Sequence, residues 1–195
     1  MPISRQNLED LDVLIPFYKK NADIISFVVF TTLTDSAELK PRESNEEFKI
    51  DPELFFSKTK SLYGKDFDYS ACLGKIKSDG ISWILACSFF MKGELLGSVD
   101  QGVNKIILDS HYKKNKKYFF VFNDIDLEMK TIFSLIFNKS LLKIAFNFLL
   151  AVIKNGIGTY SKQQLLIINT PGKVNGEWDL CDGCPDAILY TGCVS

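Results

Sequence analysis

The chain has 195 residues, 46% of them apolar, which is enough for one substantial hydrophobic core and a small appendage. Its 23 Lys and Arg residues balance 24 Asp and Glu residues, so the net charge is −1. Because no overall field attracts phosphate backbones or anionic membranes, we expect no nucleic-acid partner.

The first third of the chain predicts a helix, a strand, a loop and a second helix. Apolar residues recur every three or four positions between Asn7 and Lys20, which indicates a helix. Residues 23–32 are rich in β-branched and aromatic side chains, which favours a buried strand. Residues 35–49 are polar and predict a surface loop. Asp51-Pro52-Glu53 then provides a helix start, and Gly64 a stop.

The middle of the chain is less regular. Residues 67–73 and 81–91 are apolar, and the second stretch fits the helical and the strand period equally well. Lys113–Lys117 is a basic cluster ahead of an aromatic run; we interpret it as a solvated loop before a strand rather than a phosphate or membrane contact. We expect His111, the only histidine, at the surface.

Two further helices are predicted, over residues 125–138 and from there to Asn155-Gly156. The second places six apolar residues on one face: Leu141, Ile144, Ala145, Phe148, Leu149 and Val152. Lysines and asparagines interrupt residues 131–153 before the ~18 apolar residues that a membrane span needs. We therefore expect no transmembrane span but a buried or surface-docked amphipathic helix.

The last predicted strand covers Leu165–Ile168, and Pro171-Gly172 turns the chain away from it. Buried strands alternating with amphipathic helices favour an α/β fold with a largely parallel sheet. Residues 171–195 lack such a period. We therefore predict an α/β domain over residues 1–170 and an irregular, cysteine-rich tail over residues 171–195.

Five cysteines suggest metal or redox chemistry in a reducing compartment. No apolar signal-peptide core follows Met1, so we expect a cytoplasmic protein, where clustered cysteines bind metal more often than they form structural disulfides. Cys72 and Cys87 have apolar neighbours and are interpreted as small core residues.

The other three cysteines form the candidate site. Two residues separate Cys181 from Cys184, a spacing that allows both sulfurs to bind one metal, and Gly183 permits the tight turn this needs. Cys193 offers a third thiolate, so a zinc ion or a four-iron cluster would need a fourth ligand. The alternative is a redox dithiol, although the pair does not lie near a first βαβ unit.

The run Cys181-Asp182-Gly183-Cys184-Pro185-Asp186, after a final apolar strand and before a further cysteine, resembles the carboxyl-terminal signature of certain radical SAM proteins. Residues 17–30 are similar to a helix-then-strand segment in the latter half of the same proteins. The resemblance covers most of the chain, but the three cysteines spaced Cys-x3-Cys-x2-Cys that bind the catalytic cluster are absent from the 195 residues.

This resemblance implies a partial (β/α) barrel and an auxiliary iron–sulfur cluster, of the 4Fe-4S type, held by Cys181 and Cys184. Either Cys193 replaces a later family cysteine, or that ligand is missing because the chain is truncated. It also implies that the chain is a carboxyl-terminal fragment or split subunit, inactive alone, which serves substrate positioning or electron transfer. S-adenosylmethionine would act only in the complete protein or with a partner chain that carries the SAM-binding cluster. The alternatives are a zinc-stabilised, non-enzymatic binding domain and a thiol redox protein.

Overall fold

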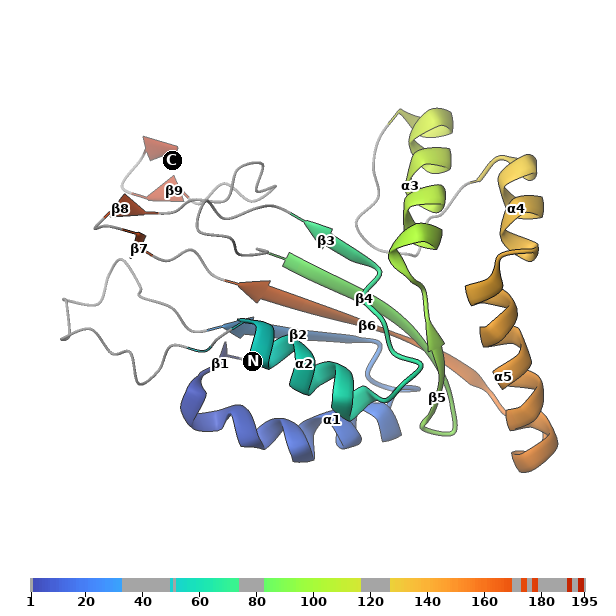
Figure 1. Cartoon of the computed structure of the whole chain (residues 1–195), viewed down its shortest axis with the longest axis horizontal. Helices are drawn as coiled ribbons and strands as arrows, with labels where there is room; N and C mark the ends of the chain where they lie inside the picture. Colours follow the sequence, from blue (N-terminus) through green and yellow to red (C-terminus); the bar gives the residue numbers. More distant parts are fainter. Residues whose placement is uncertain are drawn as a thin grey trace.

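The computed structural model describes residues 2–32, 50, 52–73, 83–116 and 127–169, and the backbone of four short strands between residues 173 and 194. The elements of the main body are as follows (Figure 1): β1 (Pro2–Ile3), a 3-10 helix (Arg5–Asp10), α1 (Leu11–Lys20), β2 (Phe27–Thr32), α2 (Pro52–Tyr63), β3 (Ala71–Leu73), β4 (Trp83–Met91), β5 (Glu94–Ser98), α3 (Gln101–Asn115), α4 (Met129–Ile136), α5 (Lys139–Asn155) and β6 (Tyr160–Asn169).

One mixed sheet organises these elements. The strand order is β1-β2-β6-β4-β3, and β5 also pairs with β4. β1, β2 and β6 are mutually parallel, whereas β4 runs antiparallel to β6, β3 and β5. β6, the last strand of this sheet in chain order, therefore lies in its middle.

Helices α1 and α2 cover one face of the sheet. Leu11 and Ile15 of α1 and Phe55 of α2 pack with Phe30 of β2 and Ile167 of β6, and all five are fully buried. A buried amide reinforces this layer: Gln163 accepts a hydrogen bond from Tyr63 Oη and donates to the carbonyls of Tyr18 and Ile25. This face contains the largest core cluster.

The other face carries α3, α4 and α5. Cys87 of β4 packs with Val103 and Ile107 of α3 and with Leu135 of α4. Towards the β4–β5 turn, Met91 and Leu96 pack with a second group of side chains from α5: Ile144, Phe148, Ala151 and Val152. Helices on both faces of one sheet confirm the predicted α/β class.

The prediction of a largely parallel sheet is wrong. Only two residues, Lys92 and Gly93, separate β4 from β5, and both have positive φ (51° and 79°). So short a connection joins only antiparallel strands, because a parallel crossover needs a dozen or more residues. Together with the antiparallel β4–β6 pair, this hairpin makes the sheet mixed and open, in place of the expected run of parallel strands.

Most of the predicted elements agree with the structure. The first helix and strand are present, α2 ends at Tyr63 directly before Gly64, α5 ends at Asn155 with Gly156 as its cap, and β6 contains residues 165–168. The ambiguous stretch 81–91 contains strand β4. The predicted loop over residues 35–49 lies outside the described residues.

Helix α3 was not predicted, and it corrects two expectations. Lys113 and Lys114 belong to its last turn rather than to a loop before a strand, although both are exposed as expected. His111 is buried, not at the surface, and Asn115 on the next turn lies 3.3 Å from its Nδ1. Only Val103 and Ile107 among the five buried residues of α3 are apolar, the others being Asn104, Ser110 and His111, so its apolar helical period is weak.

Candidate functional site

The cysteine-rich tail leaves the sheet at the edge where the parallel strands end. Thr32, the last residue of β2, pairs with Asn169, the last residue of β6. Ile3 of β1 pairs with the same Thr32, and Thr32 Oγ1 donates to the carbonyl of Ile168. Ligands of open α/β sheets bind at the carboxyl ends of the strands, so this edge is where a site is expected.

Two short antiparallel pairs follow β6. β7 (Lys173–Val174) pairs with β8 (Glu177–Trp178), and β9 (Leu189–Tyr190) pairs with β10 (Cys193–Val194). In Figure 1, β7, β8 and β9 lie beyond the carboxyl end of β6. The tail is thus less irregular than predicted. Its sequence contained a signal for the first pair, because the intervening Asn175-Gly176 is a dipeptide typical of two-residue hairpin connections.

Of the three predicted ligands, the structure describes only Cys193, and only its backbone. Cys193 belongs to β10, and its backbone lies opposite Tyr190. Cys181 and Cys184 lie outside the described residues. Their donor chemistry fits the group that the resemblance implies, because thiolates are the preferred ligands of iron–sulfur clusters and of zinc.

Cys87 does not serve as the missing fourth ligand. Its side chain is 1% exposed and lies in the core between β4 and α3. Burial raises the pKa of this thiol from an ordinary 9.0 to about 12, an effect that the nearby Lys162 charge only partly offsets. Since metals bind the thiolate, Cys87 acts as the core residue that its apolar neighbours predicted. For Cys72, the structure describes only the backbone, in β3 opposite Ile84.

Within the described ranges, no group of three or more His, Cys, Asp and Glu side chains could hold a metal ion. His111 is buried beside Asn115 in α3.

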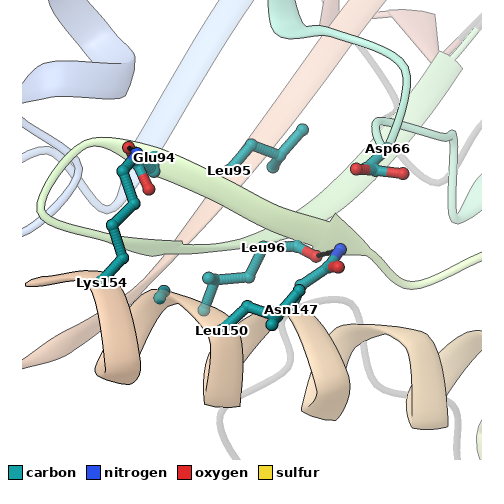
Figure 2. A pocket seen from close by; sticks show the side chains of 8 residues that line it. Asp66, Glu94, Leu95, Leu96, Asn147, Leu150 and Lys154 are labelled. Carbon is teal, nitrogen blue, oxygen red and sulfur yellow. Dashed lines mark hydrogen bonds and ion pairs between the residues drawn. The ribbon is translucent and has the colours of Figure 1, made fainter.

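A groove lies between β5 and α5 (Figure 2). Its volume is about 200 Å³, and Asp66, Glu94, Asn147 and Lys154 supply its polar lining. These groups are occupied in holding α5: Lys154 Nζ lies 2.6 Å from Glu94 Oε1, and Asn147 Nδ2 donates to the carbonyl of Leu96 at 2.8 Å.

The chemistry of this groove does not suggest a catalytic role. The hydrogen bond from Lys154 is the main cause that lowers the pKa of Glu94, so this carboxylate stays ionised at neutral pH and is a poor general acid. Lys143 Nζ likewise pairs with Asp66 Oδ1 at 2.6 Å. We conclude that the groove is a junction between helix and sheet.

Comparisons with known proteins found no similar protein. No protein-family model matches the chain, and no curated protein or solved structure is significantly similar to it. The functional argument therefore depends on the residues of this chain.

Proposed function

We propose that this chain binds an iron–sulfur cluster, of the 4Fe-4S type, through Cys181, Cys184 and Cys193, and that it forms the auxiliary-cluster part of a radical SAM enzyme. The observation that carries the proposal is the run Cys181-Asp182-Gly183-Cys184-Pro185-Asp186 after the final strand of an α/β domain. When bound, such a cluster supplies a one-electron redox centre or a point of attachment for substrate.

Two features of the described residues support this proposal. The tail leaves from the carboxyl ends of β2 and β6, the edge at which α/β proteins bind ligands. In addition, Cys87, the cysteine whose side chain is described, is buried as a neutral thiol, which argues against Cys87 as a competing thiolate ligand. The mixed sheet differs from half of a (β/α) barrel, so the proposal depends on the cysteine run and not on barrel geometry.

The chain's share of the chemistry is to hold the cluster and to orient it beside a catalytic centre on another chain or segment. No Cys-x3-Cys-x2-Cys set occurs in the 195 residues, so the chain alone is expected not to cleave S-adenosylmethionine. A partner that carries the SAM-binding cluster completes the proposed enzyme.

The test is a visible absorption spectrum with iron, sulfide and zinc analysis on anaerobically purified, reconstituted protein. We expect a brown protein that contains iron and acid-labile sulfide, and a colourless Cys181→Ala, Cys184→Ala variant. Cys87→Ala is the matched control, because it removes a cysteine without touching the tail and should retain iron. Cys193→Ala is expected to lower the iron content.

A different metal would favour the second candidate, a zinc-stabilised binding domain, because the same three thiolates also suit zinc. A colourless protein with one tightly held zinc ion per chain would replace the cluster proposal. Reversible oxidation of Cys181 and Cys184 without any metal would instead identify a thiol redox protein.

A further inference from the structure

Helices α4 and α5 expose an unusual number of large apolar side chains. Phe146 and Ile153 of α5 are 58% and 80% exposed, and Phe137, between the helices, is 77% exposed. We call the following ten residues the α4–α5 apolar surface: Met129, Ile132, Phe133, Ile136, Phe137, Leu142, Phe146, Leu149, Leu150 and Ile153. A surface of this kind marks an interaction site with a protein or a membrane.

Helix α5 is apolar on two sides. Its inner side packs Ile144 and Phe148 against the β4–β5 hairpin. A second side is polar, since Lys143 and Lys154 reach Asp66 and Glu94. The remaining side carries Leu142, Phe146, Leu149 and Ile153 at helical spacing, all of them exposed. A helix that is apolar beyond its core-facing side requires a further apolar partner.

We propose that the α4–α5 apolar surface docks on an anionic lipid surface. Residues 129–155 contain four lysines (Lys130, Lys139, Lys143 and Lys154) and no Asp or Glu, although the whole chain has a net charge of −1. The positive charge is therefore concentrated on the two helices that expose the apolar side chains. Lysines beside Phe, Leu and Ile are the composition of helices that lie in a membrane interface.

The chemistry of the surface favours lipid over a protein partner. The ten side chains that define it contain no nitrogen or oxygen atom. Protein interfaces form about one hydrogen bond per 100–200 Å², which these side chains cannot supply. Lys130, Lys143 and Lys154 do form ion pairs, with Glu128, Asp66 and Glu94, but their side chains are largely exposed. The Lys154–Glu94 pair is exposed on both sides and therefore weak, so Lys154 can exchange Glu94 for lipid phosphate.

The geometry favours docking along the membrane rather than crossing it. Within the ranges that the structure describes, no single helix is long and apolar enough to span a bilayer. α4 and α5 reach the required length and composition only as a pair, and the pair is bent by 63° at residues 137–138. A bent pair attached to a folded sheet can place its outer side in the interface.

Vesicle flotation with the full chain tests the proposal. We expect binding to vesicles of phosphatidylcholine with phosphatidylglycerol, and a drop of at least about 100-fold in partitioning for Phe146→Gln, Leu149→Gln, Ile153→Gln, because three apolar side chains no longer enter the lipid. The matched control is Val13→Gln, Phe17→Gln, Ile24→Gln, which replaces three equally exposed apolar residues at and beside α1 and should bind like the parent. Circular dichroism should show that both variants remain folded.

The contribution of charge is tested separately. Lys130→Gln, Lys139→Gln should lower binding to anionic vesicles by about fivefold per lysine and reduce its salt dependence. The proposal would be overturned if the chain bound no vesicles, or if it bound vesicles of phosphatidylcholine alone as well as anionic vesicles. It would also be overturned if the Val13, Phe17, Ile24 control lost as much binding as the Phe146, Leu149, Ile153 variant. So would a dimer in light scattering that the Phe146, Leu149, Ile153 variant abolishes, because the occupant would then be a second copy. The Cys181→Ala, Cys184→Ala variant should still bind, so this result is independent of the cluster.

Discussion

At the residue scale, Cys87 shows how the same side chain takes opposite roles in different surroundings. It lies in a strand at the centre of the sheet, where burial keeps the thiol neutral. The tail cysteines stand in a polar, glycine-containing run after the last long strand. Neighbouring residues distinguished the two groups in the sequence, and the structure confirms the prediction for Cys87.

The raised pKa of Cys87 predicts both its reactivity and a pH dependence of stability. Iodoacetamide at pH 8 should leave Cys87 unmodified in the folded protein and modify it in urea, as measured by mass spectrometry of its peptide. Its folded pKa of about 12 exceeds the ordinary 9.0, so its stabilising contribution is complete below pH 9 and decreases as the pH rises towards 12.

Cys87→Ala provides the comparison for that pH dependence. Between pH 9 and 11 its free energy of unfolding should fall less steeply than that of the parent, by up to about 1.4 kcal/mol per pH unit. Parallel curves for the two proteins, or rapid modification of folded Cys87, would show that the thiol is accessible.

At the scale of elements, α5 fits closely against β5 at Gly97. The φ of Gly97 is +147°, and a Cβ there would lie 2.7 Å from Cγ1 of Ile144. The absence of a side chain thus allows the strand and the helix to approach. Asn147 strengthens the same contact through its hydrogen bond to the carbonyl of Leu96.

Gly97→Ala should therefore destabilise the protein by about 2–4 kcal/mol, through a strained backbone and an overpacked contact. Gly64→Ala is the matched control, since φ there is +114° but no atom lies within 4 Å of the added Cβ. It should cost only the backbone strain, about 1–2 kcal/mol. Urea unfolding measures both; equal losses would mean that the contact with Ile144 adapts.

The sequence predicted those elements whose apolar period is strong or whose ends carry clear signals. Pro52 and Gly64 bounded α2, and Gly156 ended α5. Helix α3 was missed because its buried side includes the polar residues Asn104, Ser110 and His111, although Asp100 caps the helix by accepting from the amide of Val103. The β4–β5 hairpin was missed because Lys92-Gly93 was not recognised as a two-residue turn.

At the scale of the molecule, the α/β class followed from the alternation of elements, but the strand directions did not. In the chain, 68 residues lie between the end of β4 and the start of its antiparallel partner β6, and no local pattern encodes that pairing. The candidate site was predicted from the spacing of Cys181, Cys184 and Cys193 and from the resemblance of the run that contains the first two. Its fourth ligand was not predictable, because ligands come together through tertiary structure rather than spacing.

The core clusters predict how the whole chain responds to loss of metal. Their members in the described part of the chain lie between Ile3 and Ile167, ahead of the tail cysteines in the sequence. Removing metal from the loaded protein with a chelator should leave the far-ultraviolet circular dichroism nearly unchanged and unfolding cooperative. A small zinc finger would unfold under the same treatment. Unfolding of the α/β domain would show instead that the metal is part of its stability.

The position of β6 has a consequence for the order of folding. It is the last long strand to be synthesised, yet it pairs with β2 on one side and β4 on the other. Until the chain has been synthesised as far as Asn169, β2 and β4 each have an unpaired edge. The core cluster between the sheet and helices α1 and α2 also remains incomplete. Pairing strands that are far apart in the chain requires long loops to close, which slows folding. The strand edges that stay exposed in the meantime promote aggregation. A ribosome-bound chain that stops before residue 160 is therefore expected to have no stable sheet.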